Sequence, residues 1–351
     1  MSTEADWGRL FDRPAVQLSQ PNIWNIPGLS SPAFLECSTV AAAYEFHNRP
    51  ASATFGDATM TTGSTLPRRL LARELRNARA AARMSSEAAR NQIGVSKQTF
   101  WRMENGIPTR LNPLFVKRLC EIYGIPADLT QVLLTLVEET KDKGWWHAFD
   151  EAIPKSFELF LGLEDAADRI ISYQTTFLPG MLQTNEYRRA MLWIEKPNRP
   201  ESNVETAINI VALRRARLFS DDNPLTLDVF IDESALRRST GDAGVMVGQL
   251  THLAETAQRP NVSVRVVPTS AGTYQALTFG TFVLLEFPPH PVAHLTEPPV
   301  VYVQGFTDDL YLENPEEVAM YRSAHTDLDR LASSAADSQA LILDIAKEFG
   351  A

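Results

Sequence analysis

Four side chains between residues 97 and 102 could hydrogen-bond a partner outside the protein. They are an ammonium, an amide, an indole and a guanidinium, from Lys97, Gln98, Trp101 and Arg102. Ammonium and guanidinium groups donate to guanine O6 and N7, and a glutamine amide can pair with adenine N6 and N7. At about 100° per residue in a helix, the last three share one face, and apolar residues such as Phe100 lie opposite. The segment has the chemistry of a helix that reads bases.

Sequence signals indicate where this helix begins and ends. Ser96 is a good N-cap, because its hydroxyl can accept a hydrogen bond from an amide of the first turn. Gly106, after Asn105, can adopt the left-handed conformation that ends a helix. Directly upstream, residues 85–94 begin with serine and end with glycine, which predicts a shorter helix. Two helices joined by a tight glycine turn form a helix-turn-helix.

Residues 84–106 resemble the two-helix core of the lambda-repressor-like (XRE) transcription regulators. Two positions depart from that family. Arg90 stands where a small residue is usual, and Ser86 where a glutamine usually reaches toward DNA. Either the first helix sits differently here, or Arg90 lies at a rim where its stem runs along the surface. The residues that carry the resemblance are Gly94, Val95, Ser96, Glu104, Asn105 and Gly106.

The resemblance implies a second helix lying in the major groove of double-stranded DNA, with its N-terminal half toward the bases. Its lysine, glutamine and arginine then read bases, while the serines and the asparagine contact phosphates, which fix register. The indole either packs on the sugar backbone or covers the loop after the helix. The predicted DNA contacts are Ser85, Ser86, Lys97, Gln98, Trp101, Arg102 and Asn105.

Charge is divided unevenly along the chain. The net charge is −10, but residues 66–125 hold twelve Lys and Arg against four Asp and Glu, so this segment carries +8 and the rest −18. That asymmetry is typical of a DNA-binding module joined to an acidic domain. A basic helix face is usually only solvated, but beside a helix-turn-helix it can attract phosphates. The face predicted to do so, on a helix over 67–83, carries Arg69, Arg73, Arg76 and Arg83.

Composition and pattern predict a multidomain protein of 351 residues, 44% of them hydrophobic. Residues 1–65 lack periodicity and are expected to be disordered, or to result from an overlong start-site assignment with Met60 as the true start. Residues 66–142 are predicted to form an all-α, five-helix lambda-repressor-like domain. No apolar run long enough for a membrane span and no signal-peptide pattern is present. The two cysteines are expected to be reduced thiols, which indicates a cytoplasmic protein. The predicted DNA binding would place it at the nucleoid.

Residues 143–351 are predicted to form an α+β domain, helical over 145–220 and then a mixed or antiparallel sheet. Strands are expected at 225–231, 262–267, 281–287 and 300–304, and helices at 243–258 and 316–331, with a helix near the C-terminus. This half resembles the C-terminal domain of actinobacterial regulators grouped around WhiJ and Scr-type proteins. The resemblance rests on motifs that include Trp145-Trp146, Pro179-Gly180-Met181-Leu182-Gln183-Thr184, Asp232-Glu233-Ser234-Ala235-Leu236 and Arg259-Pro260-Asn261.

Other candidate chemistry is weaker. His290 and His294 lie among prolines that forbid a helix, so no metal site is expected there. Glu164, Asp165 and Asp168 are expected at the start of a helix, where acids favour the positive end of the dipole. The charges at 232–233 and 237–238 are expected to form an ion-pair network. We expect neither a cofactor nor enzymatic activity.

These observations predict a sequence-specific DNA-binding transcriptional regulator. The resemblance implies a role in development or secondary metabolism and a small neighbour-encoded partner protein. A single helix-turn-helix module buries little DNA surface, so a homodimer through the C-terminal domain is expected. The alternatives are a regulator that senses a small molecule and, less favoured, an enzyme fused to a DNA-binding module.

Overall fold

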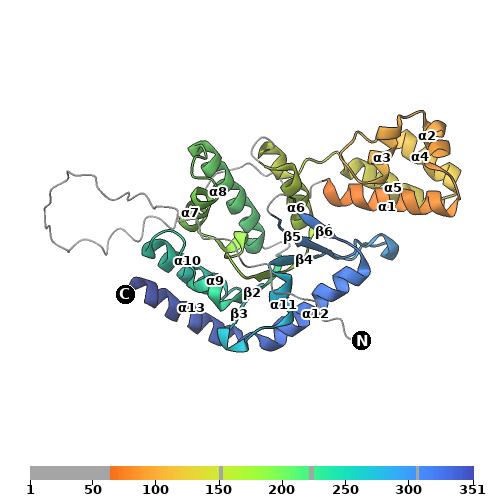
Figure 1. Ribbon diagram of the computed structural model, residues 1–351. Helices are drawn as coiled ribbons and strands as arrows, with labels where there is room; N and C mark the ends of the chain where they lie inside the picture. Colours follow the sequence, from red (N-terminus) through yellow and green to blue (C-terminus); the bar gives the residue numbers. More distant parts are fainter. Residues whose placement is uncertain (1–63, 150–152, 221–224, 306–307) are drawn as a thin grey trace, which may run out of the picture. The chain divides into compact units, whose positions relative to one another are not determined.

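The structure, a computed structural model, describes residues 64–149, 153–220, 225–305 and 308–351 (Figure 1). The predicted N-terminal extension over 1–65 and the alternative start at Met60 lie, apart from residues 64 and 65, outside this described part. No helix within it is long and apolar enough to cross a membrane.

Residues 65–139 are helical and pack around one core. The predicted apolar stripe of the first helix supplies Leu71 and Leu75, each 1% exposed, which meet Leu119 and Leu133 from later helices. The first helix ends earlier than expected, so that Arg83 lies beyond it with a positive φ of 52°. The helices are α1 (Thr65–Ala81), α2 (Ser86–Ile93), α3 (Lys97–Glu104), α4 (Pro113–Tyr123) and α5 (Ala127–Glu139).

The C-terminal part is built on a mixed six-stranded sheet with the order β3-β2-β1-β4-β5-β6. Strands β1, β2 and β3 run parallel, whereas β4 pairs antiparallel with β1 on its other side, and β5 and β6 continue antiparallel. The parallel half needs long helical connections, and the antiparallel half does not. The strands are β1 (Arg169–Gln174), β2 (Thr226–Asp232), β3 (Val262–Val267), β4 (Phe282–Glu286), β5 (Val300–Val303) and β6 (Leu310–Leu312).

Helices cover both faces of this sheet, so the expected α+β domain with a mixed sheet is confirmed (Figure 1). One core joins alternate residues of β2, such as Leu227 and Val229, to α6, α7, α9, α10 and α13. The other joins Ile171 and Phe230 to α11 and α12. The helices are α6 (Lys155–Ala166), α7 (Asn185–Glu195), α8 (Glu201–Ala216), α9 (Glu233–Arg237), α10 (Ala243–Thr256), α11 (Gln275–Phe279), α12 (Pro315–Leu331) and α13 (Ala335–Gly350).

The expectation that residues 145–220 are wholly helical is wrong at one important place. Residues 169–174 form β1, which lies between β2 and β4 inside the sheet. Ile170, Ile171 and Tyr173 are all at most 2% exposed, because this strand is covered on both faces. A short apolar run buried on both sides has no amphipathic period, so it cannot be told from a buried helix by pattern alone.

The junction motif at Trp145-Trp146 begins the C-terminal packing. These residues open a 3₁₀ turn, η1 (Trp145–Phe149), and Trp146 is 1% exposed in a small cluster with Ile153, Leu161 and Ile210. Since α6 and α8 supply Leu161 and Ile210, the indole anchors the segment that follows the helical region to the C-terminal domain.

Candidate nucleic-acid interface

Serine caps and a glycine set the geometry of the two central helices. The Ser85 hydroxyl accepts from the Ala88 amide at 3.1 Å, and the Ser96 hydroxyl accepts from the Thr99 amide at 3.1 Å. Between them Gly94 has φ of 66°, a left-handed conformation that costs an L-residue with a side chain about 1 kcal/mol. Each helix therefore begins and ends where the sequence predicted, with a tight turn between them.

The two faces of α3 separate as expected. Phe100 and Met103 are 2% and 4% exposed and join the core, whereas Trp101 is 55% exposed. All seven predicted DNA contacts are exposed residues on α2, on α3, at the α2 N-cap or at the α3 C-cap. Among the described residues, the side chains of Lys97, Gln98 and Arg102 have no hydrogen bond or ion pair, so their donors are free for a partner.

The Asn105 side chain is already used within the protein. Its amide nitrogen donates to the Trp101 carbonyl oxygen at 2.6 Å, and the same oxygen accepts from the Asn105 backbone amide at 3.0 Å. Its backbone carries the chain into Gly106, at φ of 66°, and the Ile107 amide then donates to the Arg102 carbonyl oxygen at 3.1 Å. Asn105 thus closes the helix, and a phosphate contact would have to come from its remaining N–H.

A buried ion pair holds α3 against α1. Arg79 Nε and Nη2 donate to the two carboxylate oxygens of Glu104 at 2.6 and 3.0 Å, and Arg79 Nη1 donates to the Met84 carbonyl oxygen at 3.0 Å. Hydrogen bonding to Glu104 raises the pKa of Arg79 despite burial. Glu104 is only 6% exposed. The sequence analysis missed this pair because its partners are 25 residues apart. The only local signal was that Glu104 follows Met103, which lies on the apolar face of the predicted helix.

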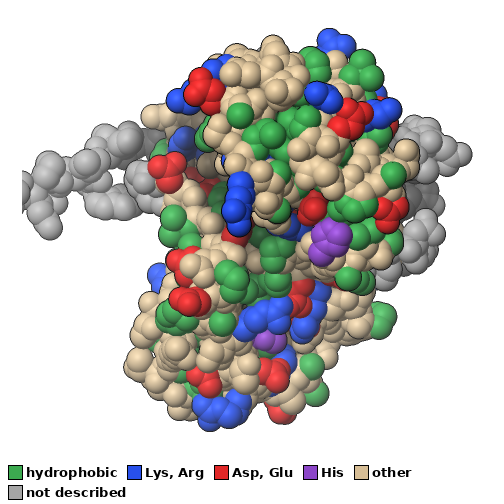
Figure 2. All heavy atoms as spheres, turned by 90° about the vertical axis from the view of Figure 1, so that its right-hand side faces the viewer, with side chains coloured by type: hydrophobic (Ala, Val, Ile, Leu, Met, Phe, Trp, Pro, Cys, Tyr) green, Lys and Arg blue, Asp and Glu red, His purple; other side chains and the backbone are tan. Residues whose placement is uncertain are grey.

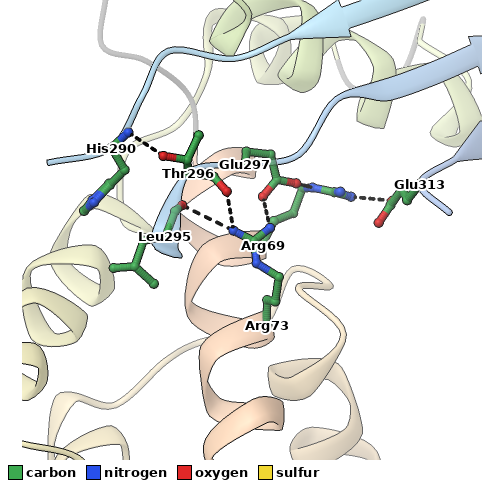
Figure 3. A network of polar contacts seen from close by, with 7 residues as sticks. All are labelled: Arg69, Arg73, His290, Leu295, Thr296, Glu297 and Glu313. Atoms are coloured by element: carbon green, nitrogen blue, oxygen red, sulfur yellow. Dashed lines mark hydrogen bonds and ion pairs between the residues drawn. The ribbon is translucent and has the colours of Figure 1, made fainter. Parts of the chain in front are cut away.

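Two of the four predicted phosphate-binding arginines contact carboxylates within the chain (Figure 3). Arg69 Nε lies 2.6 Å from Glu297 Oε1, and Arg73 Nη1 pairs with the other oxygen. Arg69 Nη1 also reaches Glu313 at 3.0 Å, and Arg73 donates to the Thr296 carbonyl oxygen at 3.0 Å. Burial opposes the charge of Arg69, but the two glutamates outweigh it and raise its pKa.

The remaining two arginines are placed differently. Arg76 donates to the Glu104 carbonyl oxygen at 2.7 Å, next to the end of α3, and Arg83 is exposed beyond α1. The four side chains therefore do not form one free basic face. On the face shown in Figure 2, Lys and Arg side chains are scattered among acidic and apolar ones. In this arrangement Arg76 and Arg83 are the two of the four that pair with no carboxylate among the described residues.

The departure at Arg90 is explained by packing. Ala89 is the residue that is fully buried under α3, and Arg90 lies beside it with its side chain 29% exposed, 3.4 Å from Glu87. Arg90 thus occupies the rim of the interface between the helices, which is the second of the two expected explanations.

Two clusters of charged residues in the C-terminal part form ion pairs. Glu164 lies in the last turn of α6, not at a helix start as expected, and both its oxygens accept from Arg214, at 2.6 and 2.7 Å. The ion-pair network expected at 232–233 and 237–238 forms in part: Arg237 reaches Glu233 at 2.8 Å and Glu348 at 2.6 Å, whereas Asp232 accepts hydrogen bonds from Ser234 and Tyr274. No group of three potential metal ligands occurs among the described residues.

Two family models match separate ranges of the chain. A helix-turn-helix domain model matches residues 70–133, which include α2 and α3. A second model, a domain of unknown function (DUF5753), matches residues 157–344, more than half of the chain. No curated protein and no solved structure matches the chain.

Proposed function

Because the chain belongs to the DUF5753 family and carries a helix-turn-helix domain in front of that domain, we propose that it is a sequence-specific DNA-binding transcriptional regulator. The observation that carries the proposal is the outer face of α3. There Lys97, Gln98 and Arg102 are exposed and unbonded on a helix that is capped at both ends and held by the Arg79–Glu104 pair.

In the proposed complex α3 lies in the major groove and presents these three side chains to base edges. Ser85 and Ser86 lie at the N-terminus of α2, where hydroxyls and the positive end of the helix dipole favour a phosphate. The Ser85 oxygen accepts from Ala88, so its own O–H is left to donate. Trp101, more than half exposed, is available to pack on a sugar.

The same proposal assigns a role to each domain, a biological process and a partner. Residues 66–142 act as a five-helix lambda-repressor-like domain of the XRE type, and residues 143–351 as the regulatory domain. The resemblance to WhiJ- and Scr-type actinobacterial proteins supports a role in development or secondary metabolism, with a small neighbour-encoded partner and work at the nucleoid in the cytoplasm. Membership of a helix-turn-helix family favours a regulator without catalytic activity.

We place a homodimer contact in the C-terminal domain. One helix-turn-helix module buries too little surface for tight specific binding, and two-fold operators require two copies of α3 about one helical turn apart. Light scattering of the full chain tests this directly: a mass of about twice 39.1 kDa is expected, and a monomer at micromolar concentration contradicts the dimer.

The base-reading role is tested with Arg102→Ala. Loss of one good base contact costs about 1–3 kcal/mol on the selected operator and little on random DNA. Fluorescence anisotropy with both DNAs measures this difference. Arg330→Ala is the control, because Arg330 is 72% exposed on α12 and the variant removes the same charge. Equal losses on both DNAs would reassign Arg102 to phosphate binding.

A further inference from the structure

The C-terminal domain contains a cavity of about 930 Å³ at the carboxyl end of β1. Its lining residues come from α6, α7, α8 and the start of β4, beside β1, where the sheet changes from parallel pairing to antiparallel pairing. Crevices outside the carboxyl ends of parallel strands are the usual ligand sites of open α/β sheets. The volume is within the range of sites that enclose a drug-sized molecule.

One side of the cavity is aromatic. Phe160 and Tyr302 lie with ring centroids 4.3 Å apart, and Phe157 stacks on Phe160 at 5.2 Å. Phe160, Tyr302 and Phe282 are 3%, 4% and 0% exposed, so they form a rigid layer behind the wall, and the accessible rings are Phe157, half-buried, and Phe177, 41% exposed. A wall of this kind accepts the flat apolar body of a ligand.

The cavity also contains a guanidinium without a hydrogen bond. Among the described residues no group accepts from the Arg188 side chain, whose nearest carboxylate oxygen, Glu195 Oε1, is 3.9 Å away. The side chain is 25% exposed and its Nε is buried. Burial lowers the pKa of Arg188; the charge of Glu195 opposes this shift, and the charges of Arg214 and Arg199 add to it.

Comparison with its neighbour indicates that Arg188 is not a structural ion pair. Arg214 lines the same cavity and is held by Glu164 through two bonds of 2.6 and 2.7 Å. Arg188 has no such partner, although an unsatisfied buried charge is costly. Arg199, its other cationic neighbour, shares the same Glu195 at 3.4 Å, so two guanidiniums face one carboxylate. Asp309 also lines the cavity, beside Tyr302, and balances this charge, so the unbonded donors of Arg188 and not an excess of charge favour an anion.

We propose that this cavity binds a small organic monoanion whose aromatic body packs on Phe157 and Phe177 and whose anionic group accepts from Arg188. The inference rests on the proposed function in one respect: it gives a site and a ligand class to the alternative of a regulator that senses a small molecule. The binding step involves neither DNA nor the helix-turn-helix, so it can be tested independently of the proposed function.

Two fluorescent probes that differ by one charge test the proposal on the full chain. They are 8-anilinonaphthalene-1-sulfonate and its neutral parent, N-phenyl-1-naphthylamine. The first is expected to bind with a stoichiometry of one per chain. Arg188→Met should weaken it about tenfold or more, because a hydrogen bond to a charged group is lost, and should leave the neutral probe unchanged. Equal effects on both probes, or none on the anion, would overturn the proposal.

Two further variants test whether the effect depends on the position of the charge and on the cavity itself. Arg189→Met is the matched control, because Arg189 is adjacent but pairs with Glu201 and Glu205 and does not line the cavity. It should bind both probes as the wild type does. Ala207→Trp fills the cavity and should exclude both. Arg188→Met should keep its melting temperature, since the guanidinium makes no hydrogen bond; a fall of several degrees would assign Arg188 a structural role and contradict the proposal.

Discussion

Replacing Arg79 by methionine should destabilise the helical region strongly, because it leaves Glu104 as a buried and uncompensated charge. Both oxygens of Glu104 accept from Arg79, and the residue is 6% exposed. Breaking a buried pair by removing one partner costs about 3–5 kcal/mol. The Arg79 side chain is 19% exposed, so water reduces the penalty and we expect about 3 kcal/mol, the lower end of that range.

A double-mutant cycle separates the orphaned charge from lost packing. Arg79→Met with Glu104→Leu replaces the pair by two apolar side chains, and this double variant should lose about 1 kcal/mol or less. The stability is measured by urea unfolding, and hydrogen exchange over residues 96–105 shows whether α3 opens locally. Arg118→Met is the control, since Arg118 and Glu121 are both half exposed and their pair contributes under about 1 kcal/mol.

The expected coupling between the two sites is therefore large and favourable. A double variant that loses the sum of the two single losses would show that Arg79 and Glu104 act independently. That result would refute the account of how α3 is held in place.

Three further predictions follow from the described contacts. Glu297→Gln should release Arg73 from its only carboxylate partner in the described part of the chain, while Arg69 keeps Glu313, and should therefore steepen the salt dependence of binding to random DNA by about one phosphate contact, with Glu317→Gln as the control; an unchanged slope contradicts this. Gly94→Ala should cost about 1 kcal/mol in urea unfolding, because the residue has φ of 66° and no atom within 4 Å of the added Cβ; no loss would mean that the turn relaxes. Burial, more than the nearby arginines, lowers the pKa of His252 and of His325. Because the unfolded chain then binds protons more readily, unfolding free energy should fall as pH drops below about 6.5, and less so when both histidines are replaced by glutamine; an equal slope contradicts it.

Local signals predicted the two helices of the helix-turn-helix well. The caps Ser85 and Ser96 and the glycines at 94 and 106 act within one turn of the chain, so residue type and spacing are enough to place α2 and α3. The same holds for β3, predicted and observed at 262–267, whose alternating pattern matches its half-buried faces.

Features that depend on distant residues were not predictable in this way. Glu297 lies 228 residues from Arg69, and no spacing rule connects them. Strand β1 was read as helix because its burial comes from helices on both faces of the sheet. The short strand β6 and the exact place of Glu164 in α6 likewise depend on neighbours that the local pattern does not contain.

Selection of genomic fragments by the purified full chain, in the presence of excess bulk DNA, tests the central claim most directly. The account predicts that a narrow set of sites with two-fold related half-sites is enriched, and that the enrichment is lost when Lys97 and Arg102 are replaced by alanine and kept when Arg330 is replaced. Recovery of fragments in proportion to their abundance, with or without a neighbour-encoded partner, would contradict it.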